Sequence, residues 1–310
     1  MISIIIPTYN EEENVGQLIA EIDAVLANDN IEAEVIFVDD GSTDGSWQKI
    51  IDMAANDDRI RGVRFRRNFG KAAALSAGIA KARGDIIITM DADLQDNPKE
   101  IPHLLAKIDE GYDVVSGWKK IRHDPWHKVM PSRIFNWFIG KICGPPLHDH
   151  NCGLKCYKAE ALREVTLYGE LHRFITVLTY MRGFRVTEIP VEHRPRIHGT
   201  SKYGVKRFLK GLLDLITVRF LTGYGQRPQH AFGAVGSIAF VFGLAGMIYL
   251  AVLWLTGVRP IGTRPILMYS VVALLFGAQL ASVGILAELF TSYNMSAGTA
   301  RFYSISDEID

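Results

Sequence analysis

The sequence has little cysteine: three residues among 310, at Cys143, Cys152 and Cys156. An odd number gathered in one short stretch cannot form the disulfide framework of a small secreted domain, so we expect a reducing compartment. An excess of charge of one sign is also missing, because 34 Lys and Arg residues balance 34 Asp and Glu residues. Without an overall basic field we expect no nucleic-acid partner, and a polyanion would have to be bound by a local cluster of cations.

Two kinds of sequence signal are absent as well. The chain opens with MISIIIPTYNEEEN, where acidic residues follow a short apolar run, so we expect a first β-strand and not a signal peptide. Neither G-x-x-x-x-G-K-[ST] nor G-x-G-x-x-G occurs in the chain. This speaks against a P-loop ATPase or a dehydrogenase. Nucleotide binding would then have to use carboxylates and a metal ion.

Long hydrophobic runs, by contrast, are present. Residues 231–255 and 265–287 carry no charge, and each run exceeds the roughly 20 helical residues that cross a bilayer core. Two buried core helices are the alternative, but uncharged runs of this length are rare in soluble proteins. We therefore expect a cytoplasmic domain over 1–225 that includes amphipathic juxtamembrane helices, a two-span hairpin over 231–287, and a cytoplasmic tail over 288–310.

The spans contain small residues at spacings that let helix backbones approach closely, within one chain or between chains, and we expect a homo-oligomer formed through them. These residues are Gly233, Gly236, Gly243, Gly246, Gly277, Ala281 and Gly284. The segment before the first span is richer in Lys and Arg than the loop at 256–264, which holds two arginines. The positive-inside rule then places both termini in the cytoplasm.

The first 120 residues alternate apolar strands with amphipathic helices. The pattern predicts strands over 2–6, 34–38, 60–65, 85–90 and 113–116, and helices over 12–27, 46–55, 71–82 and 101–110. Such alternation is typical of the α/β class, with a doubly wound, mostly parallel sheet. Ligands of these sheets bind beyond the carboxyl ends of the strands, so the residues that follow each strand are the functional candidates.

Acidic residues follow the strand predicted over 85–90. In an extended segment Asp91 and Asp93 would point to the same side, and Gln95 would continue that side. Oxygen ligands of this kind suit Mg²⁺ or Mn²⁺ bound to a substrate diphosphate. The alternative is a turn whose aspartates cap the next helix. The D-x-D pattern alone is weak, and its place after an apolar strand is what favours the metal site.

A second acidic stretch, VDDGSTDGS, follows the strand predicted over 34–38. Asp39 and Asp40 at the carboxyl end of this strand can accept hydrogen bonds from a nucleoside. The alternative, to which the isolated string gives equal weight, is a plain loop in which Ser46 caps the following helix.

Six motifs taken together carry a resemblance to a known family. They are IIIPTYNEEENV (4–15), VDDGSTDGS (38–46), RNFGKAAALSAG (67–78), DADLQD (91–96), CGLK (152–155) and RPRIHGTSKY (194–203). In this order, and followed by two spans, they resemble the polyprenyl-phosphate glycosyltransferases of glycosyltransferase family 2, relatives of dolichol-phosphate mannose synthase and of bactoprenol glucosyltransferases. The resemblance implies a GT-A fold, a nucleotide-sugar donor, Mg²⁺ or Mn²⁺, and a polyprenyl phosphate acceptor in the cell envelope.

The resemblance also implies a reaction and a location. The expected reaction is inverting transfer of a hexose, glucose from UDP-glucose, to undecaprenyl phosphate at the bacterial plasma membrane. Synthesis of polyprenyl-phosphate mannose from GDP-mannose is the alternative. A processive polysaccharide synthase is a further one, but the Q-x-x-R-W motif of such enzymes does not occur here.

Roles of single residues follow from the same resemblance. The donor nucleotide would be bound by Pro7, Tyr9, Glu11, Asp39, Asp40 and Lys71, the metal by Asp91, Asp93 and Gln95, and catalysis would involve Asp91, Asp93 and Asp149. The acceptor phosphate would be bound by Arg122, Arg133, Arg194, Arg196, Ser201 and Lys202. Cations and a hydroxyl suit phosphate, although a basic patch on anionic lipid is the alternative. Relatives often have an arginine near Lys119, and either Lys119 or Arg122 can take that role.

Three further stretches have two interpretations each. HDHNCGLKC (148–156) offers four zinc-ligand types, His148, His150, Cys152 and Cys156, at spacings that do not match known zinc knuckles. The resemblance instead places Cys152 in the wall on the acceptor side, with Asp149 near the reaction centre. The amphipathic stretches 126–143 and 205–221 are either helices in the membrane interface or ordinary core-facing helices. For 205–221 we expect the interface, because this stretch precedes the first span.

Overall fold

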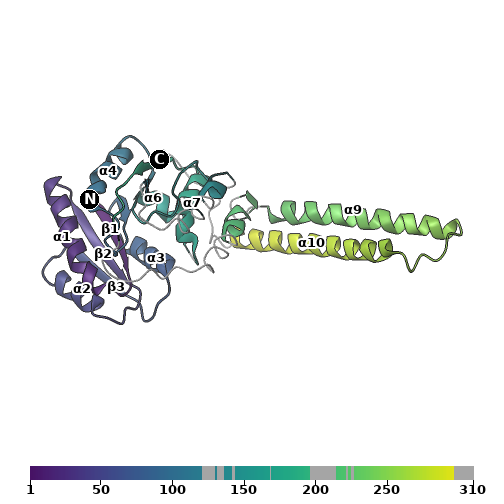
Figure 1. Ribbon diagram of the computed structural model, residues 1–310, viewed down its shortest axis with the longest axis horizontal. Coiled ribbons are helices and arrows are strands. Elements are labelled where there is room, and N and C mark those ends of the chain that lie inside the picture. The colour runs from purple at the N-terminus through teal and green to yellow at the C-terminus, as the bar shows by residue number, and fades with distance from the viewer. Residues whose placement is uncertain are drawn as a thin grey trace. The chain divides into compact units, whose positions relative to one another are not determined.

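The computed structural model describes residues 1–120, 130, 136–141, 144–167, 169–195, 214–220, 223–224 and 227–296. The chain divides into two compact units, Met1–Val218 and Arg219–Asp310 (Figure 1). The sequence-based boundaries at 225, 231 and 287 stay predictions.

A seven-stranded sheet lies at the centre of the first unit, in the order β3-β2-β1-β4-β6-β5-β7. The strands are β1 Ile2–Thr8, β2 Ala33–Asp39, β3 Ile60–Arg64, β4 Ile86–Thr89, β5 Val114–Trp118, β6 Lys155–Lys158 and β7 Val186–Pro190. Among the strands in the described residues, only β6 runs antiparallel to its neighbours, β4 and β5. The prediction of a mostly parallel α/β sheet is confirmed.

Helices cover both faces of this sheet. They are α1 Glu12–Asn28, α2 Ser46–Ala54, α3 Lys71–Lys81, α4 Ile101–Asp109, α6 Ala159–Arg163 and α7 Ile175–Met181, with the 3-10 helices η1 Pro98–Glu100 and η2 Leu171–Phe174. Side chains of β1 alternate between the faces, so Ile4 and Ile6 join one core cluster with residues of α1 and α2, while Ile5 joins another with residues of α3. A sheet buried on both faces explains the nearly continuous apolar strands.

The two amphipathic stretches each present one buried and one exposed apolar side in the described residues. Ile139, in the helical residues 136–141, packs with Leu215 and Val218 of the helical residues 214–220 in one core cluster. Trp137 and Ile216, by contrast, are both 62% exposed. The described parts of both stretches therefore pack against the protein and also expose large apolar side chains, and their place in the membrane interface stays a prediction.

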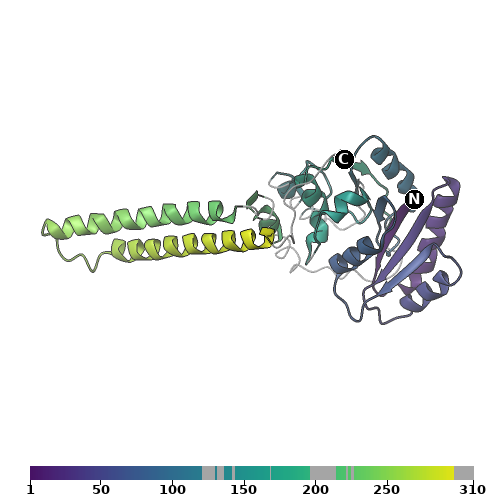
Figure 2. The same ribbon diagram turned by 180° about the vertical axis from the view of Figure 1, so that it is seen from behind.

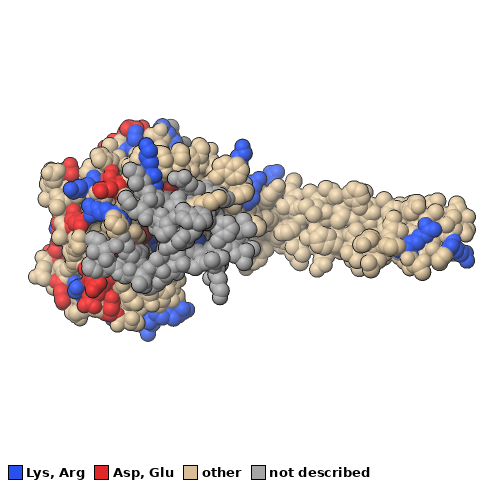
Figure 3. Space-filling model, in the orientation of Figure 1, with Lys and Arg blue, Asp and Glu red and all other residues tan. Residues whose placement is uncertain are grey.

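The second unit contains the helices α9 Pro228–Leu255 and α10 Pro265–Ser296, which run side by side in Figures 1 and 2. Both are long and apolar enough to cross a membrane, with mean hydropathy of 2.4 and 2.0 in their most apolar windows. Only 11% and 17% of those windows are buried, unlike the core helices of soluble proteins. On the face seen in Figure 3, this pair is almost free of charged side chains along most of its length.

Glycines bring the two helices into backbone contact. A Cβ atom added to Gly236 would lie 2.8 Å from the carbonyl oxygen of Gly277, and one added to Gly243 would lie 2.6 Å from the backbone nitrogen of Leu274. The small residues thus pack α9 against α10 of the same chain. The homo-oligomer stays a prediction.

Gly236→Ala is expected to destabilise this helix pair, whereas Gly233→Ala is not. Alanine favours a helix over glycine by about 0.5–1 kcal/mol at either position, but overpacking at Gly236 costs about 1–3 kcal/mol. At Gly233 the nearest atom, Gln229 Cγ, would be 3.7 Å from the new Cβ, an ordinary contact. Thermal unfolding in detergent should show a lower Tm for Gly236→Ala alone. Equal Tm values would contradict the close helix contact.

Candidate active site

The acidic D-x-D segment lies at the carboxyl end of β4 but is not extended. The strand ends at Thr89, Ala92 and Asp93 form a turn, and Leu94 has a φ of 61°. The turn places Ala92 and Leu94 in the core. The prediction that an extended segment aligns Asp91, Asp93 and Gln95 on one side is therefore wrong. Their role as metal ligands stays a prediction.

Asp91 lies among cations. Its carboxylate forms an ion pair with Lys71, the first residue of α3, and its backbone N–H donates to Asp96 Oδ2 at 3.3 Å. Burial raises the pKa of Asp91, but Lys71, with Lys119 and His172 further away, holds it below the usual range. Asp91 is therefore a carboxylate at neutral pH. Lys71, assigned to the donor by resemblance, contacts Asp91 in this structure.

The segment before β6 reaches the same edge because β6 is antiparallel. Lys155, the first residue of β6, pairs with Thr89 near the end of β4 and with Ser116 of β5. Three successive carbonyl oxygens are bound there: Cys152 O by Lys155 Nζ at 2.7 Å, Gly153 O by Thr89 Oγ1 at 2.9 Å, and Leu154 O by Gly117 N at 2.9 Å. This loop therefore has a fixed path across the ends of β4 and β5.

Gly153 touches the acidic cluster directly. A Cβ atom added to it would lie 2.6 Å from Asp91 Oδ2 and 2.8 Å from Asp96 Oδ2. No side chain fits at this position unless the loop or the carboxylates move. The glycine in CGLK was the available sequence signal, but its meaning depends on the approach of two segments about 60 residues apart along the chain.

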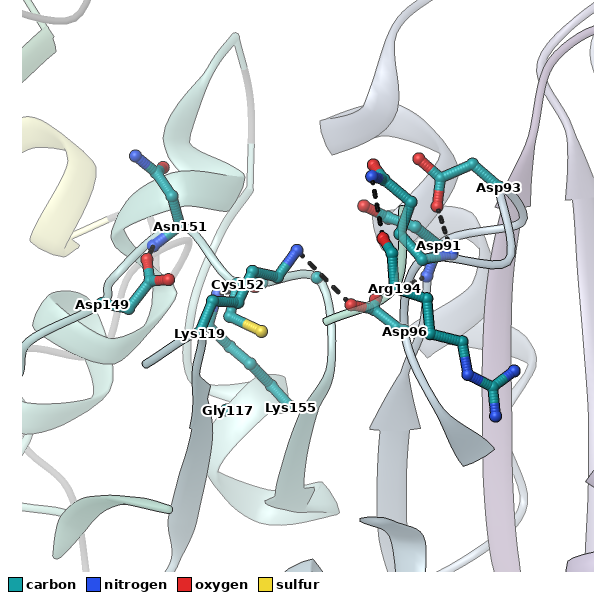
Figure 4. A network of polar contacts seen from close by, with 12 residues as sticks. Asp91, Asp93, Asp96, Gly117, Lys119, Asp149, Asn151, Cys152, Lys155 and Arg194 are labelled. Carbon is teal, nitrogen blue, oxygen red and sulfur yellow. Dashed lines mark hydrogen bonds and ion pairs between the residues drawn. The ribbon is translucent and has the colours of Figure 1, made fainter. Parts of the chain in front are cut away.

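Lys119 supplies a cation to the same place. Its Nζ lies 3.5 Å from Asp96 Oδ1, and Figure 4 shows it directed toward that carboxylate. Burial lowers the pKa of Lys119, but Asp96, with Asp91 and Asp149 further away, raises it above the usual range. Lys155 is different, because burial lowers its pKa to about 8. Of the two candidates for the expected arginine, Lys119 lies at the site, and Arg122 lies outside the described residues.

Asp149 lies at the same edge and is 1% exposed. Its Oδ1 accepts a hydrogen bond from the backbone N–H of Asn151 at 3.0 Å, and its carbonyl oxygen accepts one from Ser116 Oγ at 3.2 Å. Figure 4 shows Asp149 and Asn151 on one side of Lys119 and the D-x-D residues on the other. The structure thus brings together acidic groups that are far apart in the sequence.

The two carboxylates predicted to bind the donor, Asp39 and Asp40, contact other groups of the protein. Asp39 Oδ1 accepts a hydrogen bond from Ser42 N at 3.2 Å, and Oδ2 lies 3.1 Å from Arg64 Nε. The Asp40 carboxylate accepts hydrogen bonds from the backbone N–H groups of Phe69 at 2.6 Å and Gly70 at 2.9 Å. Asp40 therefore fixes the loop before α3.

Pro7 lies near the end of β1, and Tyr9 and Glu11 lie between β1 and α1. This segment contacts the one that follows β2: Asp40 N donates to Thr8 O at 2.8 Å, and Glu11 N donates to Ser46 Oγ at 2.9 Å. The interpretation of Ser46 as a helix cap is wrong, since Ser46 is the first helical residue and its hydroxyl donates to Asp44 Oδ1 at 2.6 Å.

Residues 3–166 match the family model described as glycosyl transferase family 2. The chain belongs to this family. It is therefore a glycosyltransferase, as the motifs predicted.

Two curated relatives cover nearly all of this glycosyltransferase. Dodecaprenyl-phosphate galacturonate synthase of Rhizobium johnstonii is 40% identical over 298 residues, 93% of this chain and 87% of the relative. Undecaprenyl-phosphate 4-deoxy-4-formamido-L-arabinose transferase of Edwardsiella ictaluri is 33% identical over 305 residues, 97% of this chain and 92% of the relative. The similarity thus extends beyond the family domain.

Among solved structures, glucosyl-3-phosphoglycerate synthase from Mycobacterium tuberculosis, in complex with Mn²⁺, UDP and glucosyl-3-phosphoglycerate, is similar with a TM-score of 0.54 and 19% identity. The match covers 72% of this chain and 79% of that one. At this identity it shows the fold alone. The GT-A-like fold predicted for this glycosyltransferase is confirmed.

The candidate metal ligands of this glycosyltransferase are oxygen atoms, the type that a hard divalent ion prefers. Two carboxylates, Asp91 and Asp93, and the amide of Gln95 lie in one short loop, and the Gln95 Nε2 donates to Arg194 O at 3.3 Å. That contact uses the amide nitrogen, so the amide oxygen is the atom suited to a metal. Within the described ranges no three His, Cys, Asp or Glu side chains gather as metal ligands. Further ligands would have to come from Gln95 and a substrate diphosphate.

The zinc alternative does not fit the described residues. His148 contacts Glu188, whereas the buried His150 shares a hydrogen bond with Thr176 Oγ1 at 2.9 Å. Burial lowers the pKa of His150 to about 4 and raises that of Cys152 to about 12. These side chains do not converge on a common point in the part of the chain that the structure describes.

Of the residues predicted to bind the acceptor phosphate, only Arg194 is among the described residues; Arg122, Arg133, Arg196, Ser201 and Lys202 are not. The Arg194 guanidinium donates to Glu21 Oε2 at 2.6 Å and to Asn97 Oδ1 at 2.7 Å. Figure 4 shows it pointing away from Lys119 and Asp149. Here Arg194 joins α1 to the loop after the D-x-D segment, and a phosphate contact for it stays a prediction.

Proposed function

We propose that this glycosyltransferase transfers a sugar from a nucleotide-sugar donor to a polyprenyl phosphate. The observation that carries the proposal is the combination, in one chain, of the acidic edge at Asp91 with α9 and α10, two helices apolar enough for a bilayer. The names of the two relatives support the same acceptor class. We also propose that α9 and α10 span the bacterial plasma membrane with both termini in the cytoplasm, as the distribution of Lys and Arg predicts.

The sugar is a finer part of the proposal. The sequence suggested glucose from UDP-glucose, but the relatives are named for galacturonate and formamido-arabinose. We propose galacturonate, since the relative named for it is 40% identical over 93% of the chain. Undecaprenyl phosphate is the proposed acceptor, and dodecaprenyl phosphate, named for the same relative, is the second.

In the proposed reaction an acceptor phosphate oxygen attacks the anomeric carbon and inverts it. A phosphate monoester loses its second proton at about pH 6, so the acceptor is an anion near neutral pH and needs no strong base. If a base contributes, Asp93 and Asp149 are the candidates. A divalent ion at Asp91, Asp93 and Gln95 would supply charge that stabilises the leaving diphosphate. Lys119 adds a fixed cation at the same edge.

The decisive experiment is a donor panel with the full chain in detergent and undecaprenyl phosphate. UDP-galacturonate, UDP-glucose, UDP-linked formamido-arabinose and GDP-mannose are offered in turn, and lipid-linked sugar is detected by mass spectrometry. We expect product from UDP-galacturonate. Product from another of these donors corrects the sugar and keeps the reaction, whereas hydrolysis without lipid product from every donor contradicts the proposed function.

Lys202→Ala and Arg196→Ala are expected to weaken use of the acceptor about tenfold to a hundredfold each, because a charge-assisted hydrogen bond is worth roughly 1.5–3 kcal/mol. Steady-state kinetics should show a lower kcat/KM for the polyprenyl phosphate and little change in kcat/KM for the nucleotide sugar. Lys107→Ala on α4, whose Nζ pairs with Glu110, is the control. Unchanged acceptor kinetics with weaker membrane attachment would favour the lipid-patch interpretation.

A further inference from the structure

Glu188, in the middle of β7, has a nearly buried carboxylate whose described hydrogen bonds all go to one dipeptide. Its side chain is 12% exposed. Its two oxygens accept the backbone N–H of His148 at 2.8 and 3.0 Å, and Oε2 accepts that of Asp149 at 3.3 Å. The ring nitrogen Nδ1 of His148 also contacts Oε1. A buried carboxylate needs such donors, and here they fix the start of the loop that contains Asp149.

The neighbouring strand, β5, contacts other atoms of the same dipeptide, His148 and Asp149. Ser116 of β5 lies in register with Glu188, and Trp118 lies two residues further along β5, so the three side chains share one face of the sheet. Ser116 Oγ donates to Asp149 O at 3.2 Å. The Trp118 ring stacks on the His148 ring, with centroids 4.2 Å apart and planes 18° apart.

We propose that Glu188 is a positioning residue for Asp149. This inference rests on the proposed function, in which Asp149 lies beside the reacting groups. Glu188 does not reach the D-x-D segment in any described contact; it acts by fixing the backbone from which the Asp149 side chain extends. With Ser116 and Trp118 it forms what we call the 148–149 clamp. Loss of one bond of the clamp lets the Asp149 carboxylate shift, and shifts of about 1 Å can lower a rate a hundredfold.

Glutamine is the informative substitution because it keeps the shape of the side chain. Both carboxylate oxygens of Glu188 accept a backbone N–H, so whichever of them the amide nitrogen of Glu188→Gln replaces, at least one backbone hydrogen bond is lost. Glu110→Gln is the matched control. Glu110 pairs with Lys107 on the surface of α4, with a side chain that is 50% exposed.

The first measurement is hydrogen–deuterium exchange of the full chain, which needs no substrate. Glu188→Gln should accelerate exchange of the 148–149 amides at least about tenfold and leave β1 and β4 unchanged, while Glu110→Gln should change neither. Unchanged exchange at 148–149 overturns the proposal. Because this readout does not depend on turnover, it tests the clamp even if no donor is found and the proposed function fails.

The second measurement is the rate of sugar transfer in a double-mutant cycle. Glu188→Gln should lower kcat about tenfold to a hundredfold and change the KM for the donor less than twofold. In an Asp149→Asn background the same substitution should have no further effect, since Asp149 has already lost its function. A kcat unchanged by Glu188→Gln overturns the proposal. The proposal is also overturned if the losses in kcat multiply in the double variant. A fall in Tm with a proportional loss of active protein would overturn it as well, because it indicates a general structural role.

Discussion

Asp91→Ala is expected to lower the rate of sugar transfer by about 10³-fold and to leave the protein folded. The Asp91 carboxylate is ionised at neutral pH and is contacted by Lys71, so its loss removes a fixed negative charge from the predicted metal site. The side chain lies at the end of β4, outside the apolar core, and alanine fits the turn. Transfer rates over a series of Mg²⁺ and Mn²⁺ concentrations would measure the effect.

Binding of Mn²⁺ in the presence of UDP, followed by calorimetry, gives a second readout that does not depend on turnover. Asp91→Ala should weaken it strongly. The control is Asp23→Ala, which removes a 40% exposed carboxylate that pairs with Arg59 on the surface. Full activity in EDTA would contradict the metal site, and unchanged Mn²⁺ binding would remove Asp91 from it.

Gly153→Ala is expected to lower the transfer rate about a hundredfold, because a small displacement of reacting groups has effects of this size. The added methyl carbon would lie 2.6 Å from Asp91 Oδ2, so the carboxylate or the loop must move. The apparent affinity for the divalent ion should fall as well. Gly16→Ala in α1 is the matched control, since no atom lies within 4 Å of its new Cβ. Wild-type kinetics in Gly153→Ala would show that the contact between this loop and Asp91 has no functional role.

The periodicity of the sequence located five strands and four helices within a few residues, because each has a clear apolar pattern. It did not locate β6 or β7. The residues of β6, KCYK, number four and begin and end with lysine, and β7 contains proline at its end. Neither has an apolar run of its own. Their pairing with β4 and β5 decides that they are strands, and this information is not local.

The acidic edge of the site could be predicted because the carboxyl ends of parallel strands meet at one edge. The partners of the individual side chains could not. Arg194 pairs with Glu21, 173 residues away, and Asp40 binds amides of the loop at 69–70 instead of standing open at the strand end. Glu188 had no motif at all. A motif identifies side chains of the type that a reaction needs, but only the folded chain shows which other groups contact and position those side chains.

The antiparallel strand β6 also has a consequence for the order in which the chain can fold. Because β6 lies between β4 and β5, a nascent chain that ends before Lys155 can assemble only the β3-β2-β1-β4 half of the sheet. The residues of β5 are synthesised about 40 positions earlier than their neighbour β6, and until it emerges from the ribosome they have no partner in the sheet. Formation of the sheet edge that carries the candidate active site is therefore a late event in the synthesis of this enzyme, and exposed β5 is the segment that most needs protection until then.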